Sequence, residues 1–230
     1  MRTGARRPGA GQPKDECHVK FRYLALMSLV LIAGCRRPGD VIEERYGVYK
    51  IRSACPVVGI PAGTGDITLF NPAGSTDSRA IDVTAAITDL RSTCQESGDD
   101  VISTATFTVT ALRREPGPAR QVSLVFFDAA VRGGTAVAAK QLGQVIVNFP
   151  AGDIHGWTTA QATVRINRAA ATLPENVRQI LTSPRKAGDA DAAIDPLADP
   201  EVRTAVANAT FEHLVGFQLS ADQLRYNVTR

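Results

Sequence analysis

The sequence has few of the residues that catalytic and metal sites require. Its 230 residues include three histidines and four cysteines, with no H-x-x-x-H or C-x-x-C spacing and no G-x-S-x-G motif. These absences argue against a zinc site, a thiol redox centre and a serine hydrolase built on a nucleophile elbow. Aromatic residues make up 6% of the chain, which leaves little material for an aromatic-lined ligand pocket.

A strong charge of one sign is also missing. The net charge is +3, but residues 1–35 carry six of the 26 basic and two of the 23 acidic side chains, so the remainder has 20 basic against 21 acidic residues. Nucleic-acid binding needs a basic stripe that neutralises phosphates, and a nearly neutral body has no excess of basic residues to supply one. The charge pattern therefore argues against nucleic-acid binding.

The apolar run near the amino end is too short to cross a membrane. Residues 23–34 form this run, whereas a helix needs roughly twenty apolar residues to span the hydrocarbon core. Lys20 and Arg22 precede it. A basic start, a short apolar centre and small residues before a cleavage site are typical of a secretory signal peptide. We therefore assign residues 1–34 to a signal peptide.

The end of this segment carries a more specific pattern, with an aliphatic residue, two small residues and a cysteine at Ile32, Ala33, Gly34 and Cys35. It resembles the lipobox of bacterial lipoproteins, which the lipoprotein signal peptidase reads. The resemblance implies cleavage before Cys35 and a diacylglycerol on its thiol, and two or more acyl chains hold a protein stably at a membrane. The alternatives are an ordinary secretory signal or an uncleaved anchor with a chance cysteine.

The same resemblance predicts a location. Arg36 follows the cysteine, where an aspartate would be the usual signal for retention at the inner membrane. Its absence favours the outer membrane, with the protein facing the periplasm and residues 35–47 acting as a tether. In that oxidising compartment Cys55 and Cys94 can form a disulfide that closes a loop of about forty residues. The alternative is two unpaired cysteines in the core.

The body of the chain alternates apolar and polar residues. Residues 101–112 are the clearest case, because threonines occupy positions 104, 106, 108 and 110 between apolar neighbours. Period-two alternation indicates a half-buried strand. Similar or shorter patterns bring the number to about seven; they lie at residues 48–52, 66–70, 81–88, 121–126, 144–149 and 161–167.

Turn residues, and no helix-length crossovers, separate these candidate strands, which predicts antiparallel pairing. About seven strands with one buried face each favour a mainly β fold, an antiparallel two-sheet sandwich over residues 48–172. The resemblance to immunoglobulin or fibronectin domains is one of architecture only, because the Cys…Trp…Cys core signature is missing.

The carboxy-terminal part, residues 173–230, has helical periodicity and predicts an α-helical extension with a loop at 183–200. One helix is expected at 174–181 and a second, amphipathic one at 201–217 with His213 on its apolar face. His213 is therefore expected to be a core or interface residue rather than a ligand. Ser220 and Gln223 have capping-box spacing and predict a short last helix.

Few groups outside the lipobox suggest chemistry. Asp153 and His155 share a loop and could act as an oriented general base, although a surface histidine is the simpler interpretation. Trp157 and Tyr226 could be exposed anchors for a partner, although aromatic side chains are more often partly buried.

Two further patterns lack residues that their sites require. A calcium loop beginning at Asp189 would need Gly and Glu where Ile194 and Pro200 stand. The glycines at 59, 63 and 65 lack the Gly-Lys-Ser/Thr of a phosphate loop and indicate turns.

The sequence thus predicts a lipid-anchored envelope protein that acts as a structural or protein-interaction component, without catalysis, cofactor or metal. Its expected partners are the membrane, through the acyl chains on Cys35, and an envelope protein. One alternative is a binding module for a small glycan or lipid. Another is a hydrolase centred on Asp153 and His155.

Overall fold

The computed structural model describes residues 42–44, 47–49, 53–183, 188 and 193–229. The predicted signal peptide, the lipobox residues Ile32, Ala33 and Gly34, the lipidation site Cys35 and most of the tether lie outside the described residues. Two short strands, β1 (Ile42–Glu44) and β2 (Gly47–Tyr49), form a two-stranded sheet.

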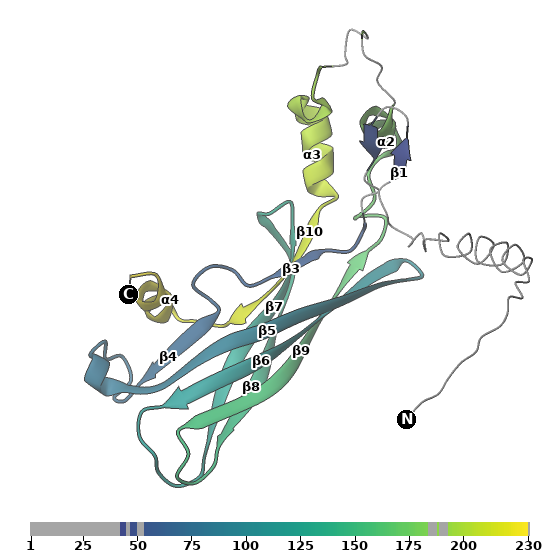
Figure 1. The fold of residues 1–230 in the computed structure, drawn as a ribbon. Coiled ribbons are helices and arrows are strands. Elements are labelled where there is room, and N and C mark those ends of the chain that lie inside the picture. The colour runs from purple at the N-terminus through teal and green to yellow at the C-terminus, as the bar shows by residue number, and fades with distance from the viewer. Residues whose placement is uncertain (1–41, 45–46, 50–52, 184–187, 189–192, 230) are drawn as a thin grey trace, which may run out of the picture. The chain divides into compact units, whose positions relative to one another are not determined.

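Eight strands form one curled, mixed sheet, a half-barrel (Figure 1). They follow the order β3-β10-β7-β8-β9-β6-β5-β4, and every pair is antiparallel except β3 with β10. The strands are β3 (Val57–Gly59), β4 (Asp66–Phe70), β5 (Ile81–Ser97), β6 (Asp100–Arg113), β7 (Arg120–Arg132), β8 (Ala136–Phe149), β9 (His155–Asn167) and β10 (Phe211–Phe217).

The prediction of a mainly β fold is confirmed, but the two-sheet sandwich is replaced by a single curled sheet. The described residues of β8 and β9 share one registered pair, Asn148 with Trp157. This pair joins the eight strands into one sheet. Two four-stranded halves, β3-β10-β7-β8 and β9-β6-β5-β4, then curl toward each other. Alternation could not distinguish the two architectures, because a strand buries one face in both.

The interior is filled by the inward residues of both halves. Along β6 the odd-numbered positions from 101 to 113 are buried, as the alternation predicts. The larger cluster draws on seven of the strands and includes Phe107, Phe126, Phe149 and Phe217. A second cluster contains Val101, Ala130, Val164, Ile166, Ala171 and Phe211, with Cys55 and Cys94 packed against it. Both clusters join residues of the two halves and so hold the curled sheet together.

The connection between β3 and β4 forms backbone hydrogen bonds with one strand in each half of the sheet. The backbone N–H of Phe217 donates to the carbonyl of Thr64 at 2.8 Å, and that of Ile87 donates to Gly65 at 2.8 Å. Phe217 belongs to β10 and Ile87 to β5, so this connection ties the halves on the side opposite to the β8–β9 pair.

The helical expectation for residues 201–217 is half wrong. The helix α3 (Pro200–Asn208) ends at Ala209, and the following residues form β10. His213 and Phe217 lie four positions apart, a spacing that fits a helix as well as a strand, and the buried position of β10 between β3 and β7 selects the strand.

The other helical predictions are confirmed. The helix α2 (Glu175–Thr182) lies where residues 174–181 were expected. The last helix, α4 (Ala221–Thr229), begins with the predicted capping box, since Ser220 and Gln223 exchange side-chain to backbone hydrogen bonds of 2.9 and 3.2 Å. Two short 3₁₀ turns, Ser78–Ala80 and Pro196–Ala198, lie in loops, the second within the loop expected at 183–200.

Arg113, at the end of β6, organises the loops at one end of the sheet. It is 4% exposed, and its guanidinium donates four hydrogen bonds of 2.7 to 3.0 Å to the carbonyls of Asp153, Pro118, Gly117 and Pro150. The guanidinium also lies 5.6 Å from the ring centroid of Phe149. Because these carbonyls belong to the β6–β7 and β8–β9 loops, one cation joins two loops.

Candidate functional site

The structure contains the disulfide that the sequence left open. Cys55 and Cys94 are bonded, with their Cα atoms 6.0 Å apart and a separation of 39 positions in the chain. Cys55 precedes β3 and Cys94 lies in β5, so the bond links the two halves of the sheet covalently.

Asp153 and His155 meet in an exposed loop. The backbone N–H of His155 donates to Asp153 Oδ1 at 2.9 Å, and the ring Nδ1 lies 3.4 Å from the same oxygen. The backbone hydrogen bond from His155 is the main reason why the pKa of the Asp153 carboxyl is lowered. Among the described residues no serine hydroxyl hydrogen-bonds to His155, so the nucleophile that a hydrolase needs does not join this pair.

The other residues singled out in the sequence have structural surroundings. Asp195 accepts a hydrogen bond from Leu197 N–H at the start of a 3₁₀ turn, whereas Asp189 and Asp191 lie outside the described residues. Tyr226 packs edge-on against Phe70, with ring centroids 5.2 Å apart. The described part of the chain holds no group of three or more His, Cys, Asp or Glu side chains that could bind a metal ion.

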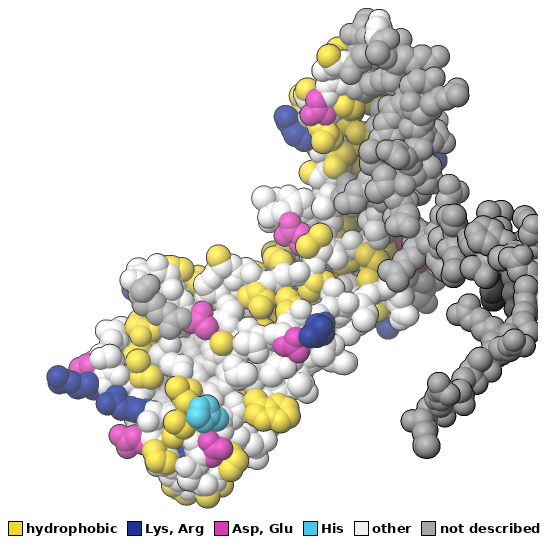
Figure 2. Space-filling view, in the orientation of Figure 1, with side chains coloured by type: hydrophobic (Ala, Val, Ile, Leu, Met, Phe, Trp, Pro, Cys, Tyr) yellow, Lys and Arg dark blue, Asp and Glu magenta, His cyan; other side chains and the backbone are white. Residues whose placement is uncertain are grey.

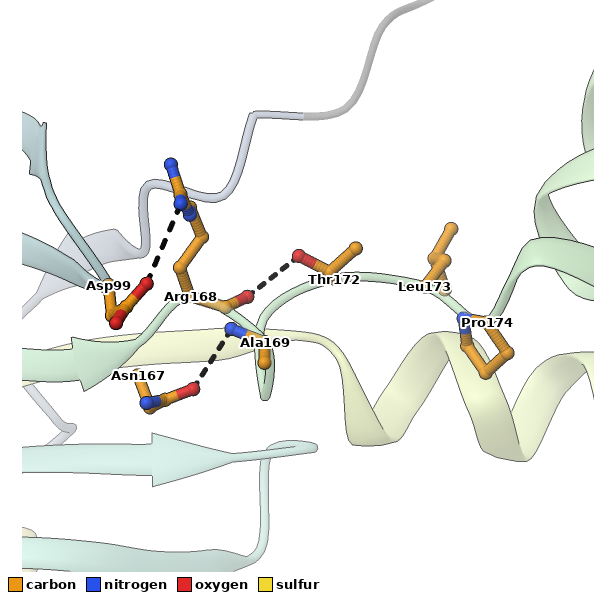
Figure 3. A pocket seen from close by; sticks show the side chains of 7 residues that line it. All are labelled: Asp99, Asn167, Arg168, Ala169, Thr172, Leu173 and Pro174. Carbon is orange, nitrogen blue, oxygen red and sulfur yellow. Dashed lines mark hydrogen bonds and ion pairs between the residues drawn. The ribbon is translucent and has the colours of Figure 1, made fainter.

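A hollow of about 710 Å³ lies where β9 ends and the chain turns toward α2 (Figure 3). Its polar groups serve local structure. Asn167 Oδ1 accepts from the Ala169 N–H at 3.0 Å, Thr172 donates to the carbonyl of Arg168 at 2.7 Å, and Arg168 lies 3.8 Å from Asp99. Because these groups satisfy one another, the hollow has no convergent set of groups for a ligand.

A buried polar relay crosses the interior of the half-barrel. Ser103 Oγ on β6 lies 2.9 Å from His213 Nδ1 on β10, and His213 Nε2 lies 2.9 Å from Asp128 Oδ1 on β7. The second contact is short, but its angles do not fit a hydrogen bond, so neither Nε2 nor Oδ1 has a hydrogen-bond partner.

The relay contains the three residue types of a serine hydrolase but not the arrangement. Ser103 and His213 are both 0% exposed, so a substrate carbonyl could not reach the hydroxyl. The order along the ring is also reversed, because a catalytic serine faces Nε2 and the carboxylate faces Nδ1. The expectation that His213 is a core histidine is therefore confirmed, although the residue lies on a strand and not on a helix.

The carboxylate end of the relay faces an opening between β8 and β9. Beyond the Asn148–Trp157 pair the two strands have no registered partner in each other, and β8 is exposed on both faces from Ala136 to Leu142. A cavity of about 370 Å³ occupies this place. It is lined by Asp128, Ala139, Gln141, Thr163, Val164 and Arg165.

Sequence reasoning missed Ser103 and Asp128, although a local signal exists for the second. Asp128 follows Val122, Leu124 and Phe126 at intervals of two, so the alternation places a carboxylate on the buried face of β7. A charge on a buried face needs a partner. That partner, His213, lies 85 positions away by the numbering of the printed sequence and could not be paired with Asp128 from the sequence.

The outer face of the sheet carries a diagonal apolar band. It consists of Leu112 on β6, Trp157 on β9, Ile146 on β8 and Val125 on β7, which are 39 to 70% exposed. Each residue of the band lies two positions along its strand from the cross-strand partner of the preceding one. Such diagonal neighbours are about 7 to 8 Å apart. Figure 2 shows hydrophobic side chains at the surface beside an exposed histidine.

Comparison with known proteins adds no relative. No family model matches the chain, and neither the curated proteins nor the solved structures contain a match. Within the described residues no helix has the length and apolar character needed to cross a membrane.

Proposed function

We propose that this protein is a lipid-anchored component of the bacterial cell envelope that binds another protein and does not catalyse a reaction. The observation that carries the proposal is the apolar band on the outer face, centred on Trp157. This side chain is the only tryptophan of the sequence and is 70% exposed. Contiguous exposed apolar residues mark interaction surfaces, and tryptophan is enriched among the residues that dominate binding energy.

Two further observations support the envelope location. The lipobox-like residues 32–35 predict an acylated Cys35, and the disulfide between Cys55 and Cys94 fits an oxidising compartment such as the periplasm. The absence of an aspartate after Cys35 favours the outer membrane. The two facing halves of the sheet offer outer faces for binding, as the sheets of immunoglobulin-like domains do.

Binding is favoured over catalysis by the surroundings of the titratable residues. The exposed Asp153–His155 pair lacks a hydroxyl partner among the described residues, and the buried Ser103–His213 pair is closed to substrate. Neither arrangement combines a nucleophile, a base and access to solvent, which acyl-transfer chemistry requires.

Site-specific photo-crosslinking of the full chain in cells tests the proposal. A photoreactive phenylalanine analogue replaces Trp157, and the matched control replaces Gln95, an exposed residue of β5. We expect one discrete protein adduct from position 157, none from position 95, and a weaker adduct when Cys35→Ala removes the anchor. Equal labelling from both positions, or no adduct from position 157, would contradict a binding role for this face.

Incorporation of an alkyne-tagged fatty acid tests the anchor separately. We expect label in the native chain and none in Cys35→Ala. Label that persists in Cys35→Ala, or is missing from both, contradicts lipidation at this residue.

A further inference from the structure

The opening between β8 and β9 exposes a strand edge inside the sheet order. From residue 136 to residue 147, β8 pairs with β7 along one edge. Its other edge has no registered partner over this stretch among the described residues. Its sequence from 136 to 142 is Ala-Val-Ala-Ala-Lys-Gln-Leu, with Lys140 the one charged residue. A long, apolar edge with open backbone groups is a template for pairing with another extended chain.

A buried carboxylate with one oxygen that accepts no aligned hydrogen bond lies beneath this edge. Asp128 lines the cavity at the opening, and its side chain is 7% exposed. Its Oδ1 atom accepts no hydrogen bond from the described residues, and its close neighbour His213 is poorly aligned with it. A buried carboxylate whose close neighbour is misaligned is stabilised when an aligned cationic donor reaches it.

The register puts the edge and the carboxylate within reach of one ligand. Asp128 is the cross-strand partner of Gln141, and Ala130 is the partner of Ala139. Asp128 and Ala130 are buried on the inner face, so Ala139 and Gln141 also point inward and flank the way to Asp128. An added strand would lie about 10 Å from β7, two strand spacings. A lysine or arginine side chain on the inner face of the added strand and the Asp128 side chain on β7 can meet across that distance.

We propose that this opening binds an extended peptide segment of a partner protein, which adds to the edge of β8 and places a lysine or arginine side chain on the Asp128 carboxylate. Backbone hydrogen bonds to β8 supply affinity, and the cation at Asp128 supplies specificity. The inference deepens the proposed interaction function and rests on it, since it names the class of partner segment. It concerns a second surface, distinct from the band around Trp157.

Binding of synthetic peptides to the full chain tests the inference directly. The probe is the capped nonapeptide Ser-Thr-Ile-Thr-Arg-Thr-Ile-Thr-Ser, and its matched control carries citrulline in place of arginine, which removes the charge and keeps the shape. We expect saturable amide shifts in residues 136–147 by NMR and at least tenfold weaker binding of the citrulline peptide. Asp128→Asn should abolish the difference between the two peptides.

Backbone methylation of the peptide tests edge pairing without changing the protein. Two versions of the arginine peptide carry N-methyl groups on alternate residues, out of phase with each other. Only one edge of an extended peptide faces β8, so we expect one version to lose binding and the other to keep it. Because these peptides act on the native chain, this test does not depend on how well Asp128→Asn folds.

Several outcomes would overturn the inference. These are equal affinity of the arginine and citrulline peptides, unchanged binding by both methylated versions, and shifts that map away from β8. A small amine such as spermidine that matches the arginine peptide in affinity would also overturn it, because the site would then bind free cations. The peptide assay uses neither Cys35 nor Trp157, so its failure is distinguishable from failure of the crosslinking test.

Discussion

His213 Nδ1 lies 2.9 Å from the Ser103 hydroxyl although 110 positions separate the two residues in the chain. The bond joins β10 to β6, which belong to opposite halves of the curled sheet. Both side chains are fully buried, so the contact is part of the core and is shielded from water.

Ser103→Ala should therefore destabilise the fold. Removing the hydroxyl leaves a ring nitrogen of His213 buried without a partner, which costs about 1 to 3 kcal/mol. Urea denaturation of the variant measures the loss. Ser97→Ala, at the exposed end of β5, serves as the control and should change the free energy of unfolding by less than about 0.5 kcal/mol. Equal effects at both positions would show that the buried bond contributes nothing.

Reduction of the disulfide should lower stability more strongly. A crosslink whose cysteines are 39 positions apart in the chain contributes about 3 to 4 kcal/mol in the chain-entropy model. We expect the urea midpoint of the native chain to fall when reductant is added, whereas the midpoint of Cys94→Ala should not respond. A native chain whose midpoint is indifferent to reductant contradicts this expectation.

Arg113→Lys tests whether four hydrogen bonds at one end of the sheet depend on a guanidinium. A lysine keeps the charge but cannot satisfy four carbonyls in this fork geometry. We expect a loss of about 2 to 3 kcal/mol and faster hydrogen exchange at Gly152 and Asp153, which lie in the β8–β9 loop. Arg91→Lys, an exposed arginine on β5, is the control. The prediction fails if exchange in that loop is unchanged.

The ion pair of Asp82 with Arg120 predicts a dependence of stability on pH. The two side chains form two hydrogen bonds of 2.7 and 2.6 Å, and the bond from Arg120 is the main reason why the pKa of Asp82 lies below its usual 3.8. A lowered pKa in the folded state adds stability that is present above the unfolded pKa and is lost as the pH falls through the folded value.

The native chain should therefore exceed Asp82→Asn in stability at neutral pH, and the difference should shrink below about pH 4. Because Arg120 is 44% exposed, the difference at neutral pH should be no more than about 1 kcal/mol. Urea midpoints at several pH values measure it. A difference that stays constant down to pH 2.5 contradicts the assignment to Asp82.

Local signals in the sequence were sufficient for much of the fold. The threonine alternation of β6 and the capping box of α4 each involve neighbours in the chain, and both are confirmed. The β5 strand extends well beyond the predicted 81–88 to Ser97, because the polar residues that follow still pair with β6 and are solvated on both faces.

Features that depend on distant residues were not predictable in the same way. Residues 211–217 fit a helix and a strand, and the choice came from neighbouring strands that the sequence does not reveal. Arg113 resembles its exposed neighbour Arg114 in sequence, yet the carbonyls that bury it come from two loops. The opening at Asp128 arises because β8 and β9 diverge after a single pair, which hairpin spacing cannot show.

The place of β10 in the sheet has a consequence for the order of folding. This strand is the last of the eight along the chain, yet it lies between β3, the first of the eight, and β7. The half of the sheet that contains β3 is therefore complete only when the residues of β10 have inserted between β3 and β7, and non-local pairing of this kind folds slowly.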